Sequence, residues 1–348
     1  MPEVRIEVPL AARFIEEEEE LVLLTHEESM FLARASREHR MVVHGCAGSG
    51  KTMLAVEHAK RLAAAGKDVL FVCFNRALMQ HLRKTVGGDG LTFQTFHGLC
   101  THLAHRAEVT LPRYGSDSPP PEYWDEELPS ALVEAIGELG PQFDALIVDE
   151  AQDLSNDWLA ALMCTLRDEE HAPVWLFIDD NQRVYDKQFE VPAEFRPHEL
   201  MVNCRNTQRI HREVMKLYEG EIVPEVRGPK GRDMELYLTD DQARKIGEVL
   251  ETLCGKEEVL PQDVVVLSSH ALDRSDVAAG VGGRWKLTKE RGKSGKHVHF
   301  SSVRGFKGLE APVIVLCELE DMDEGSRSQQ MYVGISRARN HCVVVAPK

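Results

Sequence analysis

Short runs of apolar residues alternate along this chain with longer segments in which apolar residues recur every three or four positions. Runs of the first kind are typical of buried parallel strands, and segments of the second kind are typical of amphipathic helices. Strands are expected at 41–44, 69–73, 145–148, 174–178, 264–267, 313–316 and 342–345. Helices are expected at 52–65, 77–84, 129–139, 158–166, 207–218, 241–253 and 329–337. The alternation predicts an α/β fold in which helices cover parallel sheets.

The number of expected strands exceeds what one small domain needs. A chain of 348 residues is long enough for about two domains, each with its own core. We therefore expect an N-terminal acidic extension at 1–25, a first domain at 26–193 and a second domain at 194–348. The extension is called acidic because positions 16–20 are an unbroken run of glutamate, which is typical of a solvated surface.

Composition narrows the class of protein. The net charge of −16 argues against a protein that coats nucleic acid by bulk electrostatics, although a local basic groove remains compatible with it. The eight cysteines are scattered without a CxxC pair, which argues against a zinc site or a disulfide framework and favours a cytoplasmic protein. Apolar runs stay well short of the roughly 18 residues of a membrane span, so no membrane partner is expected.

A glycine-rich motif lies between the first expected strand and the first expected helix. It reads Gly45-Cys46-Ala47-Gly48-Ser49-Gly50-Lys51-Thr52 and fits the phosphate-loop pattern G-x-x-x-x-G-K-[ST]. Backbone N–H groups of such a loop surround phosphate oxygens, and the helix N-terminus adds partial positive charge. Lys51 is expected to reach the β- and γ-phosphates of ATP, and the Thr52 hydroxyl is expected to hold Mg²⁺.

Two adjacent acids, Asp149 and Glu150, follow the apolar run 145–148. At the end of a parallel strand, Asp149 is suited to order magnesium and Glu150 to accept a proton from an attacking water. Taken without context, the pair could equally begin the next helix as an acidic cap.

The acids belong to a longer string, and further strings follow in a fixed order. They are Asp149-Glu150-Ala151-Gln152-Asp153, then 177–185, Asn203-Cys204-Arg205-Asn206-Thr207, Lys307-Gly308-Leu309-Glu310 and 332–339. This set resembles the motifs of UvrD/Rep-like superfamily-one helicases, over nearly the whole span from Gly45 to Arg339. The resemblance implies two RecA-like P-loop domains with parallel sheets and an ATP site in the cleft between them.

The resemblance also implies roles for single residues. Gln182 and Arg205 would contact the γ-phosphate, Glu310 the ribose, and Arg337 would be the arginine finger. Glu28 occupies the place where family members usually have a glutamine that reads adenine. A carboxylate there accepts hydrogen bonds but does not donate them, so the selectivity for adenine is left open.

Further strings resemble family motifs that line single-stranded DNA; RNA is left open. The residues concerned are Phe74, Asn75, Arg76, Thr95, Phe96, His97, Tyr185, Ser302 and Arg304. Polar and aromatic groups above a parallel sheet can hold a backbone and stack bases. Phe74 and Phe96 could equally be core residues, and His97 an internal hydrogen-bonding group.

Several features depart from a complete helicase. The family's usual base-stacking aromatic is missing near Lys187, and few residues separate the motifs where full members insert accessory domains. The basic stretch 280–296 could be a polar loop or a contact to a phosphate backbone. Three functions follow: an ATP-dependent DNA helicase or translocase, a DNA-stimulated ATPase switch that gates a partner such as a nuclease, and a nucleotide-gated binding module with negligible turnover.

Overall fold

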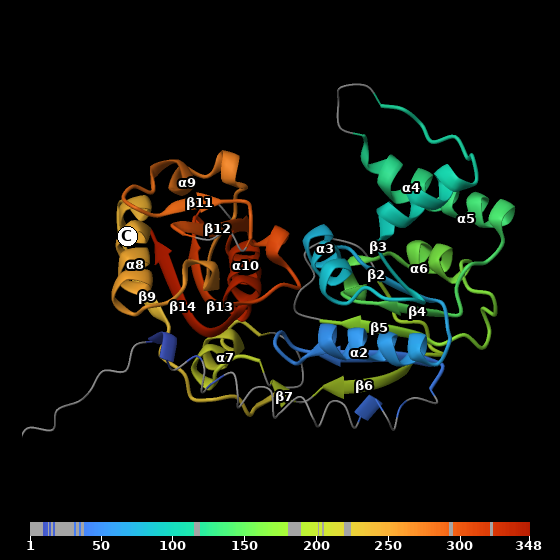
Figure 1. Cartoon of the computed structure of the whole chain (residues 1–348), viewed down its shortest axis with the longest axis horizontal. Helices are drawn as coiled ribbons and strands as arrows, with labels where there is room; N and C mark the ends of the chain where they lie inside the picture. Colours follow the sequence, from blue (N-terminus) through green and yellow to red (C-terminus); the bar gives the residue numbers. More distant parts are fainter. Residues whose placement is uncertain are drawn as a thin grey trace, which may run out of the picture. The chain divides into compact units, whose positions relative to one another are not determined.

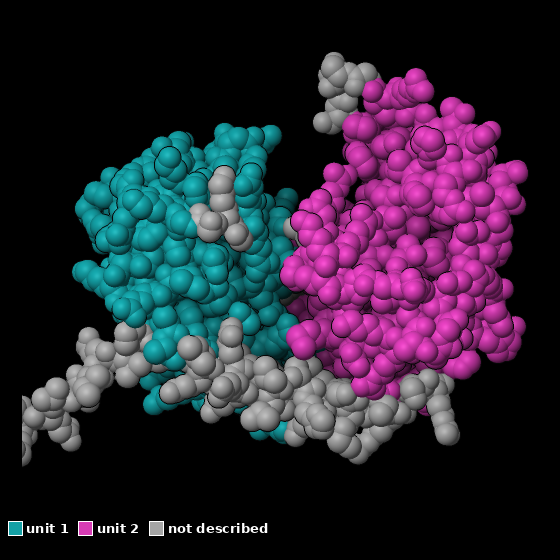
Figure 2. Space-filling model, viewed as in Figure 1, with its two compact units in different colours: residues 1–27, 46–50, 201–348 teal, residues 28–45, 51–200 magenta. Residues whose placement is uncertain are grey.

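The structure is a computed structural model, and it describes most of the chain. The described residues are 10–12, 14, 17, 31–32, 35, 38–114, 119–179, 189–200, 202–203, 205–218, 224–291, 295–320 and 323–348, with the backbone alone for Ala77. The chain divides into two compact units, which Figure 2 shows in different colours. Unit 2 consists of 28–45 and 51–200, and unit 1 consists of 1–27, 46–50 and 201–348.

Unit 2 is built on a six-stranded sheet in the order β3-β2-β4-β5-β1-β6, whose neighbouring strands all pair in parallel (Figure 1). The strands are β1 (Arg40–Gly45), β2 (Val69–Cys73), β3 (Leu91–Thr95), β4 (Ala145–Val148), β5 (Val174–Ile178) and β6 (Arg196–Leu200). The helices are α2 (Lys51–Ala64), α3 (Arg76–Thr85), α4 (Phe96–Arg106), α5 (Leu128–Leu139) and α6 (Asn156–Met163), with a π-helical turn at Tyr123–Glu127 and a 3-10 turn at Ala151–Asp153.

Helices cover both faces of this sheet. One face carries a core in which α4, α5 and α6 contribute Phe96, Leu132 and Trp158 against strand residues such as Leu70 and Leu146. On α2, His58 stacks on Trp175 of β5, with ring centroids 3.8 Å apart. Because both faces are covered, the central strands β2, β4 and β5 are buried along their whole length.

Unit 1 contains a second six-stranded sheet in the order β11-β12-β10-β13-β14-β9, again paired in parallel throughout. Its strands are β9 (Glu235–Leu238), β10 (Val264–Ser268), β11 (Lys286–Thr288), β12 (His297–Ser302), β13 (Ala311–Cys317) and β14 (Ala338–Ala346). β7 (Val202–Asn203) and β8 (Glu225–Val226) form a separate pair. The helices are α7 (Gln208–Met215), α8 (Gln242–Glu251), α9 (Asp276–Gly280) and α10 (Glu324–Ser336), and short helical turns lie at Thr252–Lys256, Pro261–Asp263, Leu272–Arg274 and Arg304–Phe306.

The core of unit 1 joins its sheet to α8 and to two residues from the start of the chain. Ile246 and Leu250 of α8 pack with strand residues such as Val266, and Leu10 and Phe14 belong to the same cluster. Part of the segment 1–25, expected to be an acidic extension, therefore contributes to a hydrophobic core. Helix α10 lies close to β13, since a Cβ placed on Gly334 would come within 2.8 Å of Leu316 Cδ1.

These observations confirm the α/β architecture with parallel sheets that the sequence predicts. The expected boundary at 193/194 differs from the observed division, because Arg196–Leu200 pairs with β1 and belongs to unit 2. Of the missed strands, β3, β6, β9 and β11 lie at sheet edges and contain polar or half-exposed positions. β12 lies inside its sheet but alternates buried with half-buried positions, so it too lacks a continuous apolar run. Among the described residues, no helix is both long and apolar enough to cross a membrane.

Candidate functional site

The phosphate loop begins at the last residue of β1 and ends in the first turn of α2. It brings the side chains of Lys51 and Thr52 to the carboxyl ends of β5 and β4. Lys51 Nζ donates to the carbonyl of Gly45 at 2.7 Å and lies 3.2 Å from Asp179 Oδ2, which directly follows β5. The Thr52 hydroxyl donates to Asp149 Oδ2 at 2.7 Å, just beyond β4. The sheet order β4-β5-β1 explains this meeting, since adjacent parallel strands end at the same edge.

The second acid has a strained backbone conformation, and its carboxylate accepts a hydrogen bond from a side chain two residues later. Glu150 has a φ of 56°, in the left-handed region that a non-glycine residue rarely adopts. Gln152 Nε2 donates to Glu150 Oε2 at 2.6 Å, and Gln152 Oε1 accepts from the Asp179 N–H at 3.1 Å. The buried Gln152 therefore connects the Glu150 carboxylate to the end of β5.

The Asp149 carboxyl is suited to hold a cation. Burial and the neighbouring Glu150 raise the pKa of Asp149 to about 7, and the hydrogen bond from Thr52 acts in the opposite direction. Asp149 Oδ1 is buried and has no hydrogen-bond partner among the described residues. A divalent cation would satisfy that oxygen and stabilise the charged form. Among the described residues, no group of three or more His, Cys, Asp or Glu side chains is placed to hold a metal ion.

The middle of the glycine-rich loop, Cys46–Gly50, belongs to unit 1. Gly48 and Gly50 have φ angles of 80° and 89°, which explains why glycine is needed at both positions. The Ala47 N–H donates to the Tyr332 hydroxyl at 3.1 Å, and Asn203 Nδ2 donates to the Ala47 carbonyl at 3.0 Å. One amide of the predicted phosphate cradle is therefore bonded to a side chain of unit 1.

Two residues of unit 1 with implied nucleotide roles contact each other. Arg205 Nη1 lies 2.9 Å from Glu310 Oε1. Burial alone would raise the pKa of Glu310, but the charges of Arg205, Arg337 and Arg339 outweigh burial and hold that pKa below its usual value. The site is thus electropositive enough to keep a buried carboxylate ionised.

The expected arginine finger, Arg337, lies at the C-terminus of α10. Its Nε donates to the Val333 carbonyl at 3.2 Å, and its side chain is 7% exposed. Three of the implied site residues, Glu28, Gln182 and Tyr185, lie outside the described residues.

The residues expected to contact nucleic acid have different environments. Phe96 is 0% exposed and stacks on Trp158, with ring centroids 4.4 Å apart, so the prediction that its side chain contacts nucleic acid is wrong. Phe74 and His97 pack against the same tryptophan. Asn75 and Thr95 accept hydrogen bonds from Leu78 N and Gly98 N and so cap helices α3 and α4.

Two arginines from these strings keep exposed side chains. Arg76 opens α3, and Arg304 begins a 3-10 turn next to Ser302, whose hydroxyl accepts from the Gly305 N–H at 3.1 Å. Both are available for a phosphate backbone.

The basic stretch at 280–296 is partly neutralised within unit 1. Arg284 pairs with Glu251 at 2.8 Å and Lys289 with Asp273 at 3.3 Å. Arg291 donates to the Glu310 carbonyl at 2.6 Å. Part of the stretch forms strand β11, and these contacts hold several of its charges within unit 1.

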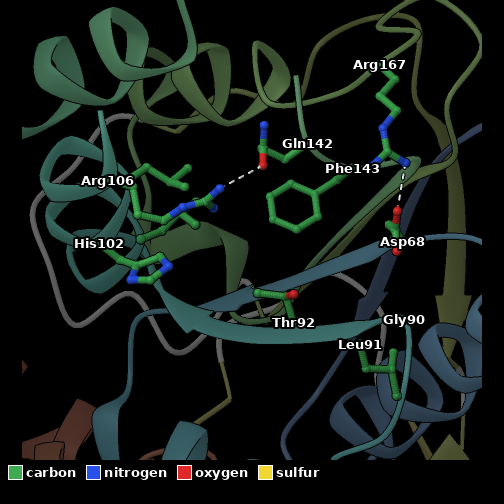
Figure 3. Close-up of a pocket in the computed structure, with 11 residues that line it drawn as sticks. Asp68, Gly90, Leu91, Thr92, His102, Arg106, Gln142, Phe143 and Arg167 are labelled. Carbon is green, nitrogen blue, oxygen red and sulfur yellow. Dashed lines mark hydrogen bonds and ion pairs between the residues drawn. The ribbon is translucent and has the colours of Figure 1, made fainter. Parts of the chain in front are cut away.

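A pocket of about 360 Å³ in unit 2 lies away from these groups (Figure 3). Its walls include Asp68, Thr92, His102, Arg106 and Gln142. Asp68 directly precedes β2, and Gln142 lies shortly before β4. The candidate carboxylates, in contrast, follow β4 and β5. The pocket therefore lies at the amino ends of these strands, whereas the candidate carboxylates lie at the carboxyl ends. It contains none of the predicted site residues.

Comparisons with known proteins agree with the order of the motifs. Residues 28–188 match the family described as AAA domain, and residues 297–345 match the UvrD-like helicase C-terminal domain. No curated protein matches the chain.

Similar solved structures include two viral helicases. The arterivirus nonstructural protein 10 helicase in complex with DNA has 17% identity and a TM-score of 0.44, over 88% of this chain and 60% of that one. The PRRSV helicase has 15% identity and a TM-score of 0.48, over 91% of this chain and 54% of that one. This chain thus spans little more than half the length of those solved chains. The AAA domain match at 28–188 and the UvrD-like helicase C-terminal match at 297–345 support the UvrD/Rep-like superfamily-one helicase core that the motifs resemble.

Proposed function

We propose that this protein hydrolyses Mg-ATP and uses the free energy to move on single-stranded DNA. The observation that carries the proposal is the hydrogen bond of 2.7 Å from the Thr52 hydroxyl to Asp149. It joins the phosphate-loop side chain suited to magnesium with the carboxylate suited to the same ion. The lysine of the loop, Lys51, is 3.2 Å from a second carboxylate at the same sheet edge.

Each candidate site residue of unit 2 has a chemical role in this proposal. Asp149 and Thr52 would hold magnesium, which when bound neutralises charge on the β- and γ-phosphates. Lys51 would exchange its contact with Asp179 for phosphate oxygens. Glu150 would accept the proton of the attacking water, and the left-handed backbone and the bond from Gln152 support this role by fixing its carboxylate. Gln182, by the family resemblance, would sense the γ-phosphate.

Unit 1 would supply the positive charge that stabilises the transition state. We assign contacts to the γ-phosphate to Arg205 and Arg337, and the ribose contact to Glu310. Arg205 and Glu310 already pair with each other at 2.9 Å, so binding of nucleotide would replace that pair by contacts to ATP. A guanidinium that acts on the γ-phosphate affects ATP hydrolysis without being needed for ADP.

We propose that Arg76 and Arg304 contact the phosphate backbone of the nucleic acid, and that Asn75 and Ser302 add polar contacts to it. The exposed side chains of the two arginines support this, since phosphate contacts depend on accessible positive charge. The scattered cysteines support a reducing, cytoplasmic setting.

A second candidate is a DNA-stimulated ATPase switch that gates a partner such as a nuclease. The observation that favours it is the short connection between β3 and β4, where the described residues form only α4, a π-helical turn and α5. Such a connection offers no accessory domain to grip a duplex. A nucleotide-gated binding module with negligible turnover is a third candidate, and the fixed Glu150 speaks against it.

The rate of ATP hydrolysis, with and without single-stranded DNA, tests the proposal, with strand displacement measured in parallel. We expect DNA to stimulate hydrolysis and the purified chain to displace a long duplex poorly. Opening each base pair requires about 1–2 kcal/mol, and the family's stacking aromatic is missing near Lys187. Stimulation of ATP hydrolysis without strand displacement would support the ATPase switch. Processive displacement of a long duplex would support a complete helicase instead. Absence of hydrolysis in both conditions overturns the proposal.

A further inference from the structure

The backbone on either side of Arg337 is bonded to one buried side chain from another segment of unit 1. Asn206 Nδ2 donates to the carbonyl of Ser336 at 3.0 Å and to the carbonyl of Ala338 at 2.6 Å. These carbonyls belong to the residues immediately before and after Arg337. Both donor hydrogens of one amide are therefore used on the segment that carries the expected arginine finger.

The other end of the same amide shapes the loop that carries Arg205. Asn206 Oδ1 accepts from Asn203 Nδ2 at 2.9 Å. Asn203 Oδ1 in turn accepts from the backbone N–H groups of Arg205 at 3.0 Å and Asn206 at 3.1 Å. A side chain that accepts from the following N–H groups forces a tight turn, so the position of Arg205 depends on this asparagine pair.

The asparagine pair is anchored in the interior of the unit. Asn203 Nδ2 lies 3.0 Å from His211 Nδ1, and His211 Nε2 lies 3.3 Å from the Pro224 carbonyl. Burial lowers the pKa of His211, so the ring is neutral at pH 7. With the hydrogen on Nε2 and donated to Pro224, Nδ1 faces the Asn203 amide as an acceptor. It shares the two hydrogens of that amide with Asn206 Oδ1 and the Ala47 carbonyl.

Backbone bonds join the same two segments. The Thr207 N–H donates to the Arg339 carbonyl at 3.0 Å, and the Ala311 N–H donates to the Arg337 carbonyl at 3.1 Å. Ala311 directly follows Glu310, the partner of Arg205. The segments around residues 205, 310 and 337 therefore form one bonded frame, in which Asn206 is the side chain that links the two arginine segments.

We propose that Asn206 is a positioning residue that holds the Arg205 and Arg337 segments at a fixed spacing, so that both guanidinium groups approach the γ-phosphate together. The proposal rests on the assignment of these arginines to ATP hydrolysis. Asn206 touches no reacting atom and acts through the backbone of its neighbours. A misplacement of about 1 Å in such a site is enough to slow a reaction by about a hundredfold.

A double-mutant cycle of Asn206→Ala and Arg337→Ala tests this role. We expect Asn206→Ala to lower kcat by about tenfold to a hundredfold and to leave the Kd of ADP unchanged within about twofold, since ADP lacks the γ-phosphate. We expect the double variant to be no slower than Arg337→Ala, because positioning has no value once the guanidinium is gone. Independent, multiplying effects, or a normal kcat for Asn206→Ala, would overturn the proposal.

Gln208→Ala is the matched control. Gln208 Nε2 also donates to a backbone carbonyl, that of Gly228 at 2.9 Å, but this bond does not join the arginine segments. We expect its kcat to stay within about twofold of the unchanged protein. If Asn206→Ala lowers thermal stability too far, Asn206→Ser, which retains one donor, should show an intermediate kcat in the same cycle.

A spectroscopic readout separates this proposal from the function it rests on. The Arg337 Nε–H donates to Val333, and its resonance in a spectrum selective for arginine side chains should shift or broaden in Asn206→Ala but not in Gln208→Ala. If Arg337→Ala hydrolyses ATP normally, the assignment of Arg337 to the γ-phosphate fails while the spectrum still reports on the frame. An unchanged Arg337 resonance in Asn206→Ala contradicts the frame itself.

Discussion

Gln152 donates a hydrogen bond of 2.6 Å from its side-chain amide to Oε2 of Glu150. Its carbonyl oxygen accepts from the Asp179 N–H, at the residue that also contacts Lys51. Glu150 and Asp179, whose carboxylate contacts Lys51, thus meet at one buried glutamine. The amide fixes the direction of the carboxylate, and the bond to Asp179 connects this carboxylate to the segment that follows β5.

The first prediction concerns this glutamine. Gln152→Ala should leave the affinity for ATP nearly unchanged and lower turnover by about tenfold, because an unfixed carboxylate meets the attacking water less often. Steady-state hydrolysis and nucleotide titration measure the two effects separately. Gln142→Ala is the matched control, since Gln142 bonds to the carbonyls of Leu139 and Gly140 at the far edge of the sheet. Equal turnover in both variants would refute the role of Gln152.

The second prediction concerns the arginine finger. Arg337→Ala should lower ATP turnover by about three orders of magnitude and leave the affinity for ADP nearly unchanged, since the guanidinium acts on charge that develops at the γ-phosphate. Arg327→Ala, on the same helix α10, is the control and should hydrolyse ATP at close to the normal rate. A Kd for ADP that rises in step with the loss of turnover would instead indicate a role in binding.

A third prediction concerns the nucleic-acid track. Replacing Arg76 and Arg304 by alanine should weaken binding of single-stranded DNA and flatten the dependence of log K on log salt by about 0.7 for each lost phosphate contact. Fluorescence anisotropy across a salt series measures this slope. The double variant Arg284→Ala and Lys289→Ala removes the same charge from side chains already paired with Glu251 and Asp273. If this second pair flattens the slope more than the first, the track runs over the basic stretch instead.

The fourth prediction follows from a buried histidine on α2. Burial, together with the charge of Arg61, lowers the pKa of His58 to about 4. The unfolded chain therefore binds an additional proton between pH 6.5 and 4, so this contribution to stability is complete above pH 6.5 and falls as the pH falls towards 4. The loss amounts to roughly 3 kcal/mol at most.

Urea unfolding followed by tryptophan fluorescence at a series of pH values measures this loss. His58→Phe keeps an aromatic ring against Trp175 and should lose less stability than the unchanged protein between pH 6.5 and 4. His105→Gln, at an exposed position of α4, should follow the unchanged protein. Parallel curves for His58→Phe and the unchanged protein would show that His58 is already accessible to protons.

In unit 2, the sequence predicts the central strands better than the edges. β2, β4 and β5 have the predicted bounds because every residue in them is buried, which requires an unbroken apolar run. β6 (Arg196–Leu200) has no such run and contains Pro197, so its pairing with β1 depends on a contact across 150 residues of chain, which a local pattern does not contain. The same reason explains why the division between units falls after Leu200.

The candidate site shows the same contrast. Lys51, Thr52, Asp149 and Glu150 are predictable because each belongs to a short string with a defined strand or helix beside it. Gln152 bonds to Asp179 and Asn206 bonds to Ser336, which are distant in the chain, so a local pattern does not contain these contacts. Phe96 shows the opposite error, because an aromatic residue next to a polar string gives no local sign of its burial against Trp158.

We propose above all that Glu150 is the proton acceptor of an ATPase whose nucleotide is held by Lys51 and Thr52. The most direct measurement is turnover of Glu150→Gln beside its affinity for ATP, since this substitution keeps the size of the side chain and removes its basicity. We expect an affinity within about threefold of the unchanged protein and a turnover lower by about a hundredfold or more. A Glu150→Gln protein that hydrolyses ATP at a near-normal rate would contradict this proposal.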